Sequence, residues 1–145
     1  MTIKCTYQKR TRKVSPLTGI ALLFISVILF ILTIPIGFVY GFMYKLITKS
    51  ITGIGEFGLK IAISLDQLGN VAMQYLLNEI MIVKGGYKFG NRDETISSVI
   101  GKNEELDTLS IFGKFINKIL NLIDPNHSLN SIDYFIEPLE NYIKK

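Results

Sequence analysis

The apolar pattern of the chain begins with one long uncharged run. Residues 14–44 contain no Asp, Glu, Lys or Arg, a stretch of thirty-one residues. A helix needs only about 20 apolar residues to cross the roughly 30 Å of bilayer hydrocarbon. From Leu17 to Ile36, fourteen residues are Leu, Ile, Val or Phe, and on insertion scales they favour the membrane by about 4–8 kcal/mol. The pattern predicts a transmembrane helix over residues 16–44.

Two other interpretations of this run are weaker. A secretion signal has an apolar core of about 7–15 residues followed by a small-residue cleavage site, whereas this run is twice as long and continues into "GFVYGFMYK". A buried core helix that is apolar on every face needs a protein around it, and a chain of 145 residues offers too little.

Three residues inside the predicted span carry further expectations. Pro35 removes a backbone donor and predicts a bend. Gly37 and Gly41 have the G-x-x-x-G spacing that lets two membrane helices approach closely, so they are candidates for helix packing.

Residues 45–84 are still apolar in bulk but are interrupted by polar positions every three or four residues, which is the period of one helix face. These positions are Glu56, Lys60, Ser64, Gln67, Asn70, Gln74 and Asn78. Each charge at a bilayer centre costs about 2.5–3.5 kcal/mol, so a second span is the minority view. We expect a hinge at Gly53, Gly55 and Gly58, and then an amphipathic helix at the membrane interface.

Residues 85–145 predict a small helical module. A glycine-containing loop comes first, and Asp93 is expected to cap a two-turn helix that ends near Gly101. Thr108 is expected to cap the next helix, which Asp124 and Pro125 end. That helix has a 3.6-residue period, in which Leu109, Phe112, Phe115, Ile116, Ile119, Leu120 and Ile123 form one face, and Lys114, Asn117, Lys118 and Asn121 face away. A last short helix is expected to hold Ile132, Phe135 and Ile136.

The fold class that follows is all-α, because the chain shows no strand alternation bounded by turn pairs. We predict a basic tail over residues 1–15, a single N-terminal transmembrane helix over 16–44, a hinge and amphipathic interfacial helix over 45–84, and a small helical module over 85–145.

Charge supports a membrane rather than a nucleic-acid partner. Residues 1–50 carry a net charge of +7 with no acid, and residues 51–145 carry −3. The cations therefore surround the apolar run and do not form a nucleic-acid surface. Five basic residues precede the span and fewer follow it closely, so the positive-inside rule predicts a single-pass protein with a cytoplasmic N-terminus.

Candidate chemistry is sparse, since the chain has one Cys and one His. Cys5 cannot pair within the chain, and no metal or cofactor is expected. Ser97, Ser98, Asp124 and His127 include the residue types of a hydrolase triad, but no nucleophile elbow or oxyanion motif accompanies them. We therefore expect no catalysis.

Three blocks resemble small uncharacterised proteins of tailed bacteriophages and prophages, including the crAss-like phages. They are "DQLGN" at residues 66–70, "GNRDETISSVIGKN" at 90–103 and "IDPNHSLNSI" at 123–132. Relatives in this group often lack the long span, and many have Cys where this chain has Ser128, so no Cys-His role is carried over. The resemblance implies a phage-encoded module whose corners meet as a structural or partner-binding corner. Its residues would be Asp93, Glu94, Thr95, Ser97, Ser98, Asp124, Asn126 and His127.

The leading expectation is a phage-encoded protein that anchors this module at the host inner membrane. Its partners would be membrane lipid, an unidentified protein and a second copy of itself. The alternative is a holin-like lysis protein that oligomerises and permeabilises the membrane.

Overall fold

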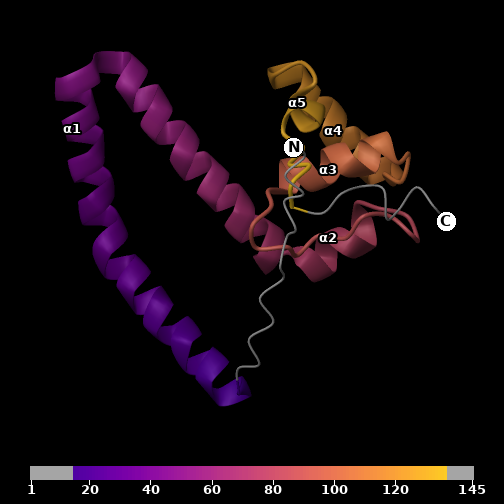
Figure 1. The fold of residues 1–145 in the computed structure, drawn as a ribbon, viewed down its shortest axis with the longest axis horizontal. Helices are drawn as coiled ribbons and strands as arrows, with labels where there is room; N and C mark the ends of the chain where they lie inside the picture. The colour runs from indigo at the N-terminus through magenta and orange to yellow at the C-terminus, as the bar shows by residue number, and fades with distance from the viewer. Residues whose placement is uncertain (1–14, 137–145) are drawn as a thin grey trace, which may run out of the picture. The chain divides into compact units, whose positions relative to one another are not determined.

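The structure is a computed structural model that describes residues 15–136, and it is all-α over this range (Figure 1). No strand is assigned to these residues, and Ile82 and Leu109 form one isolated antiparallel bridge. The predicted fold class is confirmed. The helices are α1 (Pro16–Ala72), α2 (Gln74–Ile80), α3 (Ile96–Glu105), α4 (Ile111–Ile123) and α5 (His127–Asn130).

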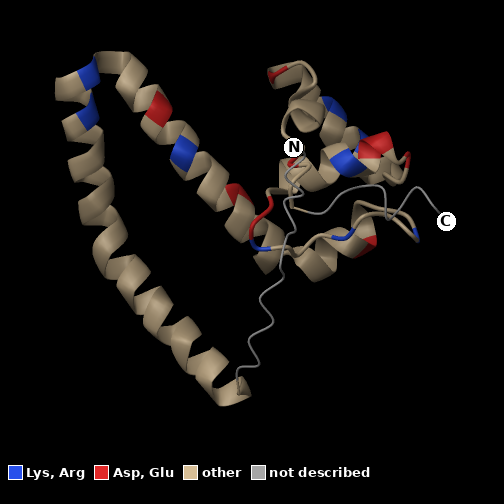
Figure 2. Cartoon of the chain, in the orientation of Figure 1, with Lys and Arg blue, Asp and Glu red and all other residues tan. Residues whose placement is uncertain are grey.

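Of the described residues, 15–61 belong to one unit and 62–136 to a second. By length and composition, α1 is the one helix in the described range that could cross a membrane. Its most apolar stretch has a mean hydropathy of 2.8, and none of that stretch is buried. Figure 2 shows the first part of α1 without any charged residue until two lysines, after which acids and bases alternate along it.

The start of α1 follows from local chemistry. Ser15 accepts a hydrogen bond from the backbone N–H of Thr18 at 3.3 Å, and Pro16 takes the first helical position, where a missing N–H costs nothing. Thr33 donates its hydroxyl to the Leu29 carbonyl at 2.7 Å, so this polar group is satisfied within its own helix. Pro35 lies inside α1, but the helix does not break there, because the residue of α1 with non-helical backbone angles is Ser50.

The break in α1 occurs at Ser50, which has φ 58° and ψ −152°. Beyond this break the chain packs back on the first part of α1, since the ring centroids of Phe57 and Phe38 are 6.0 Å apart. Gly41 leaves room for this packing, because a Cβ there would lie 2.7 Å from the Phe57 ring. Gly37 has nothing within 4 Å of such a Cβ. Packing of these two glycines between copies of the chain stays a prediction.

The expected hinge exists, but its predicted position at Gly53, Gly55 and Gly58 is wrong. All three glycines lie within helix, and the break precedes them at Ser50. Only Gly53 contributes to the break, because a Cβ there would lie 2.5 Å from the Lys49 Cβ. The break therefore needs a glycine at residue 53, where a side chain would collide with Lys49. It does not use one at residue 50, where Ser50 has the non-helical backbone angles.

In residues 62–136, α3 lies at the centre of the packing. Its residues 97–103 are all buried. The buried apolar cluster around it consists of Leu77, Met81, Ile82, Tyr87, Phe89, Val99, Ile100 and Leu109. Tyr87 and Phe89 come from the loop between α2 and α3, so this loop supplies part of the core.

Two predicted helix caps are wrong, although both helices exist. Thr95 rather than Asp93 caps α3, since its hydroxyl accepts from the Ser98 N–H at 3.1 Å. Ser110 rather than Thr108 caps α4, accepting from the Gly113 N–H at 3.0 Å. In both cases the residue that caps the helix lies two positions after the predicted one.

The C-terminal end of α4 lies at Asp124, as predicted. The last helix is shorter and earlier than expected, because α5 covers only His127–Asn130, and Ile132, Phe135 and Ile136 lie outside it. It packs on α3 at Gly101, where a side-chain carbon would collide with the backbone carbonyl of Ser128.

The polar face of α4 was expected to point away from the protein, and this is wrong for its central residue. Asn117 is only 6% exposed. Gly113, on the same side of the helix, contacts the Met81 carbonyl so closely that no side chain would fit. Gly113 and Asn117 therefore face inward, Lys114 and Lys118 are exposed as predicted, and much of the apolar side of α4 is not buried.

Candidate functional site

The most concentrated chemistry in the described residues is a buried polar cluster of Glu94, Ser98, Lys102 and Tyr87. The Lys102 Nζ lies 2.7 Å from the Glu94 Oε1, and both side chains are 0% exposed. Ser98 donates its hydroxyl to the same oxygen at 2.6 Å. Tyr87 donates to the other carboxylate oxygen at 2.8 Å.

The cluster is closed rather than open to a substrate. The Lys102 Nζ also lies 3.3 Å from the Tyr87 hydroxyl and 4.5 Å from the centre of its ring. The Ser98 hydroxyl accepts from the Asp133 N–H at 3.0 Å. A buried ion pair is tolerated when hydrogen bonds satisfy the remaining polar atoms. These contacts bind α3 to the Tyr87 loop and to the chain beyond α5.

Asparagine side chains complete the attachment of this loop. Asn103 accepts from the Tyr87 N–H at 2.8 Å and donates to the Tyr87 carbonyl at 2.9 Å. Asn78 makes the same pair of bonds to Phe89, at 2.9 and 3.1 Å. Asn70, fully buried, bonds to Asn91, Glu94 and Gly90. Each amide replaces the backbone partner that an irregular loop lacks.

The predicted corner residues on the α3 side all take part in local structure. Glu94 and Ser98 belong to the buried cluster, and Thr95 caps α3. The Ser97 hydroxyl donates to Asp66 at 2.9 Å. Asp93 is exposed and lies 3.6 Å from Arg92. These residues tie the end of α1 to the start of α3.

The residues on the α5 side form a separate exposed pair. The His127 Nδ1 lies 3.0 Å from the Asp124 Oδ2, and Asn126 turns the chain between them with φ 60°. The two corners do belong to elements that pack together, α3 and α5. The two helices touch at Gly101 and Ser128. Ser97 and Ser98 do not hydrogen-bond to His127, because Ser97 bonds to Asp66, Ser98 to Glu94 and His127 to Asp124.

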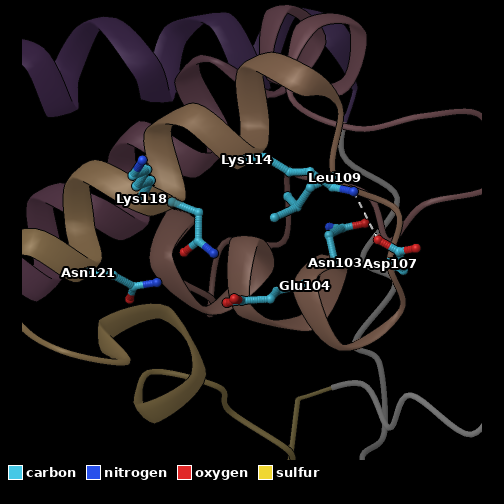
Figure 3. A pocket seen from close by; sticks show the side chains of 8 residues that line it. Asn103, Glu104, Asp107, Leu109, Lys114, Lys118 and Asn121 are labelled. Carbon is cyan, nitrogen blue, oxygen red and sulfur yellow. Dashed lines mark hydrogen bonds and ion pairs between the residues drawn. The ribbon is translucent and has the colours of Figure 1, made fainter.

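A polar cavity of about 390 Å³ lies between α3 and α4. Its lining residues are Asn103, Glu104, Asp107, Leu109, Lys114, Asn117, Lys118 and Asn121. Figure 3 shows the Lys114–Asp107 pair, 3.0 Å apart, at one end and Asn121 at the other. Of the four buried side-chain oxygens in the described residues that have no hydrogen-bond partner, three belong to residues that line this cavity: Glu104 Oε2, Asn117 Oδ1 and Asn121 Oδ1. Such acceptors suit water or a donor group of a small ligand.

Sequence reasoning missed both this cavity and the role of Lys102. Glu94, Ser98 and Lys102 are spaced by four residues, which places them along one helix face, so this signal was available. Tyr87 gave no comparable signal because it lies in a loop. No group of three or more His, Cys, Asp or Glu that could hold a metal occurs among residues 15–136, and Cys5 lies outside them.

Comparison with known proteins gives no relative. No family model matches the chain, and neither a curated protein nor a solved structure matches it significantly. The resemblance to phage and prophage proteins stays a prediction.

Proposed function

We propose that this chain is an integral membrane protein that anchors a small helical interaction module at a bilayer surface and catalyses no reaction. The observation that carries the proposal is the first part of α1. Before the break at Ser50 it is long enough, at about 1.5 Å per residue, to exceed the roughly 30 Å of hydrocarbon. Its apolar side chains are exposed around the whole helix, from Leu17 to Met43.

The closed polar cluster supports an interaction role over an enzymatic one. The Glu94 carboxylate and the Ser98 hydroxyl bond to each other and to neighbouring groups. The side chains of Glu94 and Lys102 are both fully buried. A catalytic acid or nucleophile must reach a substrate atom. The same groups are well suited to holding a binding surface rigid.

The location of the module is also part of the proposal. The resemblance to phage and prophage proteins points to the inner membrane of a bacterial host. The excess of Lys and Arg before the span favours a cytoplasmic N-terminus, which places residues 62–136 on the outer side of a single span.

The test is membrane extraction of the full chain. We expect it to stay in the membrane fraction in alkaline carbonate and to leave only with detergent. Leu23→Arg with Phe30→Arg should release it, because two charges near the bilayer centre cost about 5–7 kcal/mol, comparable to the whole gain on insertion. Asn130→Arg, outside α1, is the matched control and should remain in the membrane. Carbonate extraction of the unmodified chain would overturn the anchor.

The break at Ser50 favours one second candidate, a holin-like lysis protein. The packing of Phe57 on Phe38 makes a helical hairpin, and hairpins that oligomerise can open a membrane. Expression in bacteria would then collapse the membrane potential abruptly. Stable potential and growth during expression would exclude this candidate and leave the anchor.

A further inference from the structure

The outer side of α4 is an apolar surface that the described residues leave uncovered. We call it the α4 apolar face, and it consists of Ile111, Phe112, Phe115, Ile119, Leu122 and Ile123. Ile111 is 92% exposed, Ile123 80%, Leu122 77% and Phe115 57%. At 100° per residue these side chains share one half of the helix. Contiguous apolar patches of this kind mark interaction sites.

This exposure follows from the inverted packing of α4. Gly113 and Asn117 occupy the inner side, because only a glycine fits against the Met81 carbonyl and Asn117 faces the polar cavity. With these two residues inward, the opposite side of the helix must face outward. Only Ile116 and Leu120, at the border, pack against the core.

Lysines border the α4 apolar face on one side. Lys114 and Lys118 lie between the apolar residues and Asn117 on the helix, and the Lys114 side chain is 60% exposed. Apolar residues flanked by lysines are typical of a helix that lies in the membrane interface. The Lys114 Nζ lies 3.0 Å from the exposed Asp107, and Lys118 is exposed as well. In a membrane interface long lysine stems follow apolar surface while their charges reach anionic headgroups.

We propose that the α4 apolar face inserts into the interfacial region of an anionic lipid bilayer. This rests on the proposed function, since the span in the same chain keeps the module beside a membrane and raises the local concentration of lipid around it. The lysine border supplies the charge complementarity. The module is then held at the bilayer by two contacts, the span and α4.

The test uses single spin labels on the full chain, with Cys5→Ser as background, in phosphatidylcholine vesicles containing phosphatidylglycerol. Labels at Phe115→Cys and Leu122→Cys report the face. Leu29→Cys reports the span, and Asn130→Cys, exposed in the same unit, is the aqueous control. Collision with oxygen, which concentrates in lipid, is compared with collision with a neutral nickel chelate, which stays in water.

The expected result is a ratio of oxygen to nickel collisions several-fold higher at positions 115 and 122 than at 130. Ile111→Glu with Ile119→Glu should bring the ratio at 122 down to the control value. Lys114→Gln with Lys118→Gln should lower it in vesicles with phosphatidylglycerol and leave it unchanged in pure phosphatidylcholine. These positions are exposed, and hydrogen exchange in α3 verifies that each variant is folded.

Other results overturn the inference. Free nickel access at 115 and 122, with a lipid-exposed label at 29, would refute the α4 contact and leave the anchor intact. A label at 29 without lipid contact would refute the anchor itself. Protection from both reagents would indicate a protein cover instead of lipid, which is a second copy if protection grows with protein density and another segment of the chain if it does not.

Discussion

The Glu94–Lys102 ion pair has no exposed side-chain surface, so each charge depends on the other for its stability. Lys102→Met should lower the free energy of unfolding by about 3–5 kcal/mol, because it leaves a buried carboxylate without its counter-charge. Adding Glu94→Gln should recover part of this loss. Hydrogen exchange of the α3 amides measures the effect in the folded protein.

The matched control is Lys114→Met, which removes the exposed partner of Asp107. Exposed pairs contribute about 0–1 kcal/mol, so α3 protection should hardly change. Equal effects of the two substitutions would show that the buried cluster is not what holds α3 and the Tyr87 loop together.

Tyr134 provides a pH-dependent contact at the end of the module. Its hydroxyl donates to the Glu105 Oε1 at 2.8 Å, and this hydrogen bond to a carboxylate, with smaller contributions from burial and the negative charge, raises the pKa of Tyr134 above 10.0. The contact favours the neutral phenol, so its stabilisation is complete below the ordinary tyrosine pKa and is lost as pH rises through the raised value. Carbon NMR of labelled tyrosines, assigned with Tyr134→Phe, should show this, and Glu105→Gln should lower the pKa.

At the scale of single residues, the sequence predicted which segments carry polar groups better than it predicted their partners. Glu94 and Ser98 were predicted to belong to a structural or partner-binding corner, and the structure buries both of them beside Lys102, a residue that the prediction left out. The spacing of Glu94, Ser98 and Lys102 was a usable signal, but the cluster is completed by Tyr87, a residue of the loop before α3. No periodicity encodes that contact, because loop residues enter a core only through the fold as a whole.

At the scale of elements, the packing of α5 on α3 depends on a single missing side chain. Gly101→Ala should destabilise the module by about 1–3 kcal/mol, because a side-chain carbon would collide with a backbone carbonyl of Ser128 that cannot rotate away. This loss exceeds the gain of about 1 kcal/mol that alanine gives a helix interior. Thermal unfolding followed by circular dichroism in detergent measures the change.

Gly55→Ala is the control for this prediction. It lies inside α1 with nothing within 4 Å of an added Cβ, so it should leave stability unchanged or raise it by up to about 1 kcal/mol. A stabilising effect of Gly101→Ala would mean that α5 does not pack on α3 at this point.

Helices were predictable from the sequence, and their outward sides were not. The periodicity of residues 109–123 gave α4 and its end at Asp124. The predicted apolar face was only partly right. Ile116 and Leu120 pack against the core, whereas Ile111 and Leu122, which the prediction left out, belong to the exposed side. Most of that side stays outside because Gly113 and Asn117, on the other side of the helix, face inward. In the same way the glycines after the span suggested a hinge, while the break itself occurs at Ser50. Its positive φ is sterically unfavourable for a residue with a side chain, so local preference would not predict a break there.

At the scale of the whole molecule, the length and apolar composition of the first part of α1 could be derived from the sequence, because insertion into lipid depends on both. In the proposed membrane protein, the side of the bilayer that residues 62–136 face depends instead on the distribution of cations. A charge bias sets topology through the short segments beside a span.

Orientation is therefore open to a direct experiment. Reporters of cytoplasmic and periplasmic exposure fused after Lys145 should show a periplasmic C-terminus if the chain crosses the bilayer once. Replacing Lys9, Arg10, Arg12 and Lys13 with Gln leaves Lys45, Lys49 and Lys60 as the dominant cations, so the same fusions should then report a cytoplasmic C-terminus. Replacing Lys84 and Lys88 instead, in the loop after α2, is the control and should not reverse the chain. A cytoplasmic C-terminus in the unmodified protein would contradict a single span with a cytoplasmic N-terminus.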